Sequence, residues 1–188
     1  MNIGILGGTF NPIHVGHLIL AEEVREKLKL DTIVFVPTYL PPHKRNGDVA
    51  NALHRYKMIG LALRDNPRLS VSDIEIKRQG RSYTIDTIRQ LRKKYPKKEL
   101  YFITGSDLLK YLDEWKDLTE ILKLVKFVVG TRPGYPLERI PSYISTVGIR
   151  AVDISAFEIR QAIRRRKSFR YLVPETVYRY IKAHRLYT

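Results

Sequence analysis

Residues 1–17 of the chain are MNIGILGGTFNPIHVGH, and the apolar run LILA follows at 18–21. The apolar residues at 3–6 predict a short buried strand. Gly7 and Gly8 come directly after it and predict a tight turn, because glycine lets the backbone bend without side-chain bulk. The stretch is therefore typical of a strand, a glycine turn, a loop and the start of a helix.

That helix is predicted over residues 17–30, where apolar residues recur with helical spacing and charged residues mostly fill the positions between them. Two histidines, His14 and His17, then lie where a strand's carboxyl end meets a helix N-terminus. Helix N-termini bind phosphate, and ligands of open parallel sheets bind beyond the carboxyl ends of the strands. We expect the two imidazoles to donate hydrogen bonds to phosphate oxygens.

Simpler interpretations compete with this one. A glycine pair alone is more often an ordinary turn, and either histidine could be a hydrogen-bonded structural residue. His14 and His17 could also be metal ligands, but the chain has no cysteine and no HExxH-like set, so no metal site is predicted. The strand, the glycines, the histidines and the helix together are much more specific than any one of them.

Composition narrows the class of protein. A chain of 188 residues suits one domain, which we expect to comprise an α/β core at 1–154 and a helical C-terminal part at 155–188. The N-terminus lacks a signal-peptide pattern, and no apolar stretch approaches the roughly 20 residues that span a bilayer. A cytoplasmic protein without a membrane partner is therefore expected. The oligomeric state stays open.

The net charge of +15, from 34 basic and 19 acidic residues, favours anionic partners. Nucleotides and pyrophosphate are one class of such partners, and nucleic acid is another. The basic residues are spread along the chain, so a solvated surface accounts for much of the excess. A denser basic cluster lies at residues 160–170.

Alternation of strand and helix patterns predicts the fold class. Apolar or alternating segments predict strands at 32–37, 69–76, 99–104 and 126–131. Helical patterns lie between them, including one at 52–63. This alternation predicts an α/β protein with a Rossmann-like, doubly wound parallel sheet.

Further candidate anion sites follow other predicted strands. A proline-rich loop at 38–47 has a basic tip that includes Lys44, although a solvated loop explains it equally well. Thr84 is a plausible N-cap of a helix, and Ser155 with Glu158 forms a capping-box pattern. The helix N-terminus at Thr84 could also hold an anion, whereas the capping box explains Ser155 and Glu158 completely.

The segment GGTFNPIHVGH resembles the opening motif of nucleotidyltransferases with an HxGH signature, and most closely that of bacterial nicotinate-nucleotide adenylyltransferases. Members of that family join nicotinate mononucleotide to the AMP part of ATP and release pyrophosphate. Shorter similarities extend over nearly the whole chain. The resemblance implies the same reaction here, with Mg²⁺ held mainly by the triphosphate.

The resemblance also implies roles for individual residues. Catalysis falls to His14, His17 and Arg160, with His17 nearest the reacting phosphorus. The residues implied in ATP binding are Gly7, Gly8, Thr9, Phe10, His14, His17, Arg132, Ser155 and Arg160. Those implied in binding the acceptor are Lys44, Tyr83, Thr84, Asp107, Tyr111 and Trp115.

Two of these assignments have a specific chemical reason. The nicotinate carboxylate is expected on backbone N–H groups around Tyr83 and Thr84, and the cationic pyridinium ring against Trp115. A core position would explain the single tryptophan equally well. The chain departs from the family at Ala156 and Phe157, where hydroxyl side chains are usual, so two phosphate donors are missing there.

Two alternative functions stay open. A related nucleotidyltransferase would act on phosphopantetheine, nicotinamide mononucleotide or a sugar or polyol phosphate. A non-catalytic protein that binds RNA or DNA would use the positive charge and bind with a steep salt dependence. Nucleic acid is the less expected partner, because it does not explain two histidines beside a glycine pair.

Overall fold

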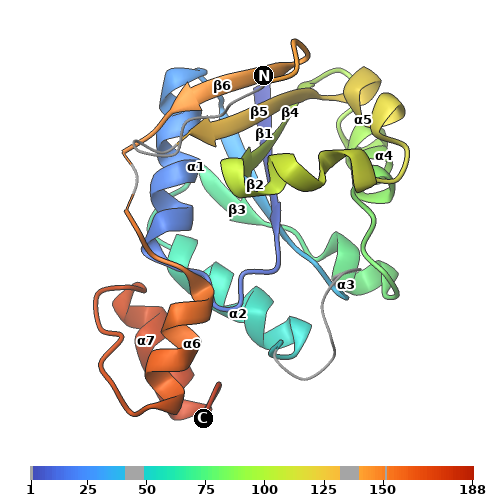
Figure 1. The fold of residues 1–188 in the computed structure, drawn as a ribbon. Helices are drawn as coiled ribbons and strands as arrows, with labels where there is room; N and C mark the ends of the chain where they lie inside the picture. The colour runs from blue at the N-terminus through green and yellow to red at the C-terminus, as the bar shows by residue number, and fades with distance from the viewer. Residues whose placement is uncertain (1, 41–48, 132–139, 151) are drawn as a thin grey trace.

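The computed structural model describes the chain apart from residues 1, 41–48, 132–139 and 151, and apart from the side chains of residues 107, 108, 110 and 111. Within the described residues, six strands form one parallel sheet with the order β3-β2-β1-β4-β5-β6 (Figure 1). The strands are β1 (Asn2–Gly8), β2 (Thr32–Pro37), β3 (Leu69–Val71), β4 (Glu99–Gly105), β5 (Lys126–Thr131) and β6 (Ile144–Gly148). This order is that of a doubly wound sheet, so the predicted Rossmann-like fold is confirmed.

Helices cover both faces of the sheet. They are α1 (Val15–Lys27), α2 (Ala52–Leu63), α3 (Ile74–Arg78), α4 (Thr84–Lys94), the 3₁₀ helix η1 (Ser106–Glu114), α5 (Leu118–Leu124), α6 (Ala156–Arg164) and α7 (Glu175–Ala183). Side chains of α1, α2, α6 and α7 share one hydrophobic cluster with the sheet. Those of α4, α5 and η1 share a second cluster on the opposite face. None of the described helices is long and apolar enough to cross a membrane.

The sheet divides its apolar side chains between the two clusters because successive residues of a strand point to opposite faces. On β1, Leu6 packs in the cluster with α1 and α2, whereas Ile3 and Ile5 pack in the cluster with α4. All three side chains are at most 2% exposed. Because β1 lies between β2 and β4 and is covered on both faces, its carboxyl end is held at a fixed place in the middle of the sheet.

The C-terminal helices α6 and α7 lie together at one end of the molecule, below α1 and beside α2 in Figure 1. Backbone N–H of Val15, the first residue of α1, donates to the carbonyl of Leu172 at 3.0 Å. The Thr176 hydroxyl donates to the carbonyl of Leu61 at 3.1 Å. The first bond holds the segment between α6 and α7 against the N-terminus of α1, where the two histidines lie, and the second holds α7 against α2.

The local structure differs from the predictions in two places. The strand expected over 69–76 ends at Val71, and residues 74–78 form α3 instead, because Ile74 packs beside the sheet in the second cluster. The sixth strand, β6, was not predicted. It pairs only with β5, and just two of its five residues are buried, so its apolar pattern is weak.

Candidate active site

A cavity of about 920 Å³ lies at the carboxyl end of the sheet. Its walls come from the ends of β1 and β4, the N-termini of α1, α4 and α6, and the segment after η1. Its lining includes the following residues of the predicted site: Gly7, Gly8, Thr9, Phe10, His14, His17, Tyr83, Thr84, Trp115, Ser155 and Arg160. Residues up to 153 positions apart in the sequence therefore face one space, as the topology of a doubly wound sheet predicts.

The glycine pair has a different role from the predicted turn. Gly7 and Gly8 both belong to β1, and the chain turns two residues later, where Phe10 has a φ of 48°. A Cβ on Gly8 would lie 3.1 Å from the Phe10 ring, and one on Gly7 would lie 3.2 Å from the ring of Phe102. The glycines thus leave the strand end bare on the cavity side, which lets a ligand approach the backbone.

The two histidines form a fixed pair at the start of α1. His14 is the N-cap residue and is only 5% exposed, and its ring stacks on that of His17 with centroids 3.7 Å apart. The backbone N–H of His14 donates to Nδ1 of His17 at 3.2 Å. Since Nδ1 accepts this bond, the neutral His17 ring carries its proton on Nε2, which is then a hydrogen-bond donor. The edge of Phe10 packs on the other side of His17, with centroids 5.0 Å apart.

Arg160 reaches the same end of the cavity from the second turn of α6. Its Nη1 donates to the carbonyl of Asn11 at 2.8 Å and to that of Ala156 at 3.0 Å. Asn11 lies in the loop between β1 and α1 and is 3% exposed. The guanidinium is therefore oriented by two backbone carbonyls next to the histidine pair.

Ser155 caps α6 as its pattern predicted. Its hydroxyl oxygen accepts a bond from the backbone N–H of Glu158 at 3.2 Å and donates to Oε2 of that residue at 2.9 Å. Of the two unusual residues that follow, Ala156 lines the cavity, whereas Phe157 is 58% exposed with its ring 5.8 Å from the Arg160 guanidinium. The aromatic ring thus contacts the arginine where the family has a hydroxyl.

The opposite end of the cavity contains the start of α4. The N-cap residue is Tyr83, with extended backbone angles, and Thr84 is the first helical residue, so the prediction of Thr84 as the N-cap was wrong by one position. Both residues line the cavity. Lys116 lies with its ammonium nitrogen 4.9 Å from the centre of the Tyr83 ring. This end therefore combines a helix N-terminus with a nearby cation, and both attract anions.

Trp115 follows η1 and lines the cavity beside this helix N-terminus. Its ring packs edge-on against Phe102, with centroids 5.6 Å apart, and against Phe127 at 5.7 Å. The indole is only partly buried. The position of the indole is compatible with both roles considered from the sequence, a core residue and a ligand contact, because it packs on Phe102 and Phe127 and also lines the cavity.

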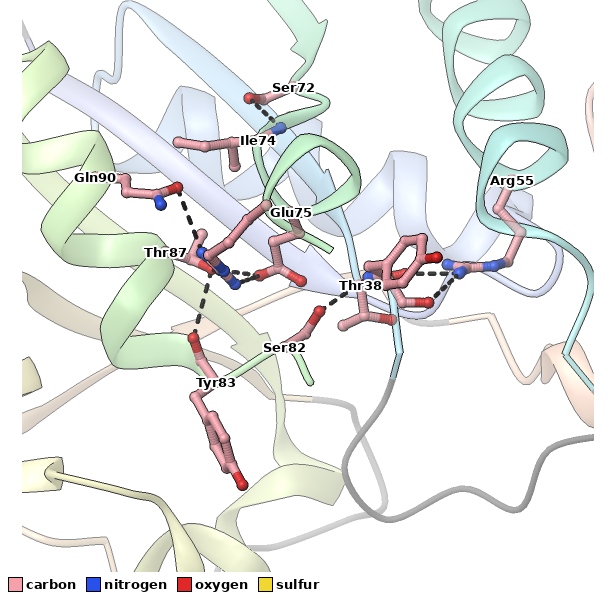
Figure 2. A network of polar contacts seen from close by, with 11 residues as sticks. Thr38, Arg55, Ser72, Ile74, Glu75, Ser82, Tyr83, Thr87 and Gln90 are labelled. Atoms are coloured by element: carbon pink, nitrogen blue, oxygen red, sulfur yellow. Dashed lines mark hydrogen bonds and ion pairs between the residues drawn. The ribbon is translucent and has the colours of Figure 1, made fainter. Parts of the chain in front are cut away.

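A buried carboxylate lies beside the first turn of α4, next to Thr87 (Figure 2). Glu75 of α3 is 5% exposed, accepts a 2.5 Å bond from the Thr87 hydroxyl and lies 3.9 Å from Nη2 of Arg78. Burial raises the pKa of Glu75, and the bond from Thr87 and the charge of Arg78 partly offset that effect. Ser82, which also lines the cavity, accepts a bond from the backbone N–H of Tyr39 at 2.9 Å.

A charged contact also joins α1 to the segment after β6. Glu23 is 5% exposed and pairs with Arg150, which lines the cavity, and with Lys27 at 3.0 Å. The hydrogen bonds from these two side chains lower the pKa of Glu23 to about 2. Glu23 therefore stays ionised and holds Arg150 at the cavity wall.

Four predicted site residues are not placed. Lys44 and Arg132 lie outside the described residues, as do the side chains of Asp107 and Tyr111. Their roles stay predictions.

Sequence reasoning missed several residues that face or support the cavity, among them Arg55, Glu75, Lys116 and Arg150. One signal for Arg55 was available. It lies on the apolar side of the pattern that predicted α2, in line with Ala52, Met58 and Ile59, where a charged residue is unexpected. No comparable signal marks the other three.

Comparisons with known proteins identify the family of the chain. The model of the cytidylyltransferase-like family matches residues 5–162. The probable nicotinate-nucleotide adenylyltransferase of Oceanobacillus iheyensis is 44% identical over 186 residues, which cover 98% of this chain and 96% of that protein. The nicotinate-nucleotide adenylyltransferase of Bacillus subtilis is 40% identical over 185 residues, which cover 98% and 97%.

A solved structure also shares the fold. It is that of Plasmodium falciparum nicotinic acid mononucleotide adenylyltransferase complexed with NaAD, which matches with a TM-score of 0.81 at 18% identity and covers 99% of this chain and 97% of that one. The identity to the bacterial relatives over nearly the full length shows that the chain belongs to the nicotinate-nucleotide adenylyltransferases, within the cytidylyltransferase-like family.

Proposed function

We propose that this chain transfers AMP from ATP to nicotinate mononucleotide and releases pyrophosphate. The observation that carries the proposal is the single cavity with two unlike ends. One end has the bare strand end at Gly8 and the stacked pair His14 and His17, and the other has the start of α4 and Trp115. The bacterial relatives are named as nicotinate-nucleotide adenylyltransferases, which supports the same reaction here.

The chemistry requires little from a general base. A phosphate oxygen of nicotinate mononucleotide is already an anion at neutral pH, and it attacks the α-phosphorus of ATP. The new O–P bond forms as the bond between the α-phosphorus and the bridging oxygen to the β-phosphorus breaks, and pyrophosphate leaves with that electron pair. Catalysis is then mainly orientation and stabilisation of the charge that develops on the phosphate oxygens.

The nucleotide end of the cavity suits that task. His17 presents Nε2–H as a donor because its Nδ1 is occupied by the backbone of His14, and this donor would face the reacting phosphate. Arg160 would neutralise charge on the departing phosphates, since two carbonyls already orient its guanidinium. The N-terminus of α6, capped by Ser155, adds backbone N–H groups.

The acceptor end of the cavity suits an aromatic acid. Backbone N–H groups at Tyr83 and Thr84 would bind the nicotinate carboxylate, with Lys116 close to the same helix start. Trp115 would contact the pyridinium ring, because tryptophan offers the best aromatic face for a cation. We further propose that Lys44, Arg132, Asp107 and Tyr111 take the binding roles that the family resemblance implies.

Mg²⁺ also belongs to the proposal. Among the described residues, no group of three or more His, Cys, Asp or Glu side chains could hold a metal ion, which fits a cation carried mainly by the triphosphate. When bound there, the ion would neutralise phosphate charge. A cytoplasmic location stays a prediction.

The test measures pyrophosphate release from ATP and Mg²⁺ with each of four acceptors: nicotinate mononucleotide, nicotinamide mononucleotide, phosphopantetheine and glycerol 3-phosphate. We expect fast release with nicotinate mononucleotide and a product with the mass of deamido-NAD. Release with another acceptor alone would retain adenylyl transfer and overturn the acceptor assignment. No release with any of them, together with tight and salt-sensitive binding of a polynucleotide, would favour the nucleic-acid alternative.

A further inference from the structure

Arg55 is the largest fully buried side chain of the described residues, and it belongs to the surroundings of the cavity rather than to its lining. It lies on the first turn of α2 and is 1% exposed. Within the described residues, the partners of its guanidinium and Nε are backbone carbonyls, of which Thr38 and Tyr39 accept from Nη2 at 2.6 Å and 3.1 Å (Figure 2). Thr9 accepts from Nη1 at 2.7 Å and Ala50 from Nε at 2.8 Å.

These four carbonyls belong to segments that meet at the nucleotide end of the cavity. Thr9 is the residue between β1 and the strained Phe10, whose φ is 48°. Thr38 and Tyr39 are the first residues after β2. The backbone ladder between the two strands ends with the bond from the N–H of Thr38 to the carbonyl of Gly8 at 2.9 Å. Beyond that point, the planar side chain of Arg55 links the two segments through the carbonyls of Thr9 and Thr38.

The contacts continue from Arg55 to Arg160. The backbone N–H of Ala50, whose carbonyl binds Arg55, donates to Oδ1 of Asn11 at 3.0 Å. The carbonyl of Asn11 in turn accepts the bond from Nη1 of Arg160 at 2.8 Å. The orientation of a catalytic candidate thus depends, through two intermediate residues, on the position of Arg55.

The charge of Arg55 is not balanced by a contacting carboxylate among the described residues. Burial lowers the pKa of Arg55 to about 10, and the electrostatic effect of Glu75 offsets a part of that shift. A buried cation that has only carbonyl dipoles as partners is costly to the free protein. An anion that enters the adjacent cavity recovers part of that cost, because the interaction passes through a medium of low polarity.

We propose that Arg55 is a positioning residue for the nucleotide: it sets the spacing of the strand ends at Thr9 and Thr38, and its buried charge favours entry of the triphosphate. The inference rests on the proposed adenylyl transfer. The proposal distinguishes two effects of Arg55. Its hydrogen-bond donors hold the strand ends in position, and its charge favours binding of the triphosphate. Lysine would retain the charge but cannot reproduce the four bonds of the planar fork.

Arg92 provides a matched control. It is also an arginine that holds backbone carbonyls, those of Lys98 at 2.7 Å and of Leu124, and it lies in the last turn of α4, away from the cavity lining. Replacing it removes the same kind of contact without changing the strand ends at the nucleotide. A merely structural role for Arg55 predicts the same kinetic result for Arg55→Met and Arg92→Met.

The experiment compares the wild type with Arg55→Lys, Arg55→Met and Arg92→Met, with kcat and both KM values measured under conditions where circular dichroism shows each variant folded. We expect Arg55→Met to lower kcat by about ten- to a hundredfold and to raise the KM for ATP about tenfold, since misplacement by about 1 Å can cost that much rate. Arg55→Lys should share the loss of kcat but keep the KM for ATP within roughly threefold of the wild type. The KM for nicotinate mononucleotide should stay within roughly twofold in all variants, because none of them alters the acceptor end.

The proposal is overturned if folded Arg55→Met matches Arg92→Met in kcat and in the KM for ATP. If Arg55→Met does not fold, Arg55→Lys decides the matter, because a normal kcat in that variant excludes the fork as a positioning device. A wild type that releases no pyrophosphate would contradict the proposed function instead. Calorimetric binding of a non-hydrolysable ATP analogue would then test Arg55 alone: weaker binding by Arg55→Met than by Arg92→Met supports its role, and equal binding overturns it.

Discussion

The nucleotide end of the cavity and the acceptor end differ in how they are assembled. The nucleotide end comes mainly from one continuous stretch, residues 7–17, whose backbone and rings are held by Arg55, Arg160 and each other. The acceptor end joins the start of α4 to Trp115, which come from separate parts of the chain. The first arrangement suits the stabilisation of a developing charge, and the second suits the choice of substrate. Substitutions should therefore separate into effects on kcat and effects on the KM for the acceptor.

The largest expected effect is that of His17→Ala at the nucleotide end. Removing the Nε2–H donor should lower kcat about a hundredfold or more, by analogy with the loss of one oxyanion donor, and leave the KM for nicotinate mononucleotide nearly unchanged. Steady-state kinetics would measure both. His54→Ala is the control, because His54 contacts the Tyr180 hydroxyl at 2.9 Å and does not line the cavity. Near-normal turnover of a folded His17→Ala would contradict the catalytic role of His17.

Trp115→Ala tests the other side of the comparison. Loss of the indole should raise the KM for nicotinate mononucleotide roughly tenfold, which corresponds to a partly desolvated cation–π contact, with a smaller effect on the KM for ATP. Trp115→Phe retains an aromatic face and should recover part of that loss. An equal rise in both KM values would indicate that Trp115 only supports the core through Phe102 and Phe127.

Ser155→Ala should produce a smaller change at the nucleotide end. The hydroxyl accepts the backbone N–H of Glu158, so its removal should lower the free energy of unfolding by about 1 kcal/mol. A frayed helix start also binds phosphate less well, so the KM for ATP should rise a few-fold while that for the acceptor stays constant. Ser155→Thr retains the hydroxyl and should restore both values. Unchanged stability in Ser155→Ala would contradict the cap.

The smallest expected effect concerns Glu75 and appears only as a dependence on pH. Burial raises the pKa of this carboxyl above its usual value of 4.5. The folded state therefore holds the proton more tightly than the unfolded state, and the stability gained from it is complete below pH 4.5 and is lost as pH rises through the folded pKa. Glu75→Gln should lack this decline.

Thermal unfolding midpoints of the wild type and Glu75→Gln between about pH 4 and pH 8 would measure the difference. As pH rises, the unfolding midpoint of the variant should increase relative to that of the wild type. The glutamine retains an oxygen that can accept the bond from Thr87. Parallel curves for the two proteins would show that the burial of Glu75 does not shift its pKa.

The elements with strong local patterns were predicted to the residue. The helix at 52–63 and the strands at 32–37 and 126–131 have the expected bounds, since their apolar residues face a core that agrees with their periodicity. Predictions failed where distant contacts decide the structure. Gly7 and Gly8 stay in β1 because β2 pairs with both of them, opposite Val36 and Pro37. Residues 74–76 became helix although their alternation favours a strand.

The sequence by itself determined the fold class and the stretch on which the proposed nucleotide end is built. Its signals are local there: a buried strand, two glycines and two histidines at the start of a helix lie within 17 residues. Only the tertiary structure decided which side chains support that stretch and which residues lie across the cavity from it. Arg55 contacts Thr9 from 46 positions away, and Trp115 and Tyr83 share the cavity with His17 because the ends of parallel strands meet at one edge. Such contacts depend on how the sheet is wound, which no local pattern records.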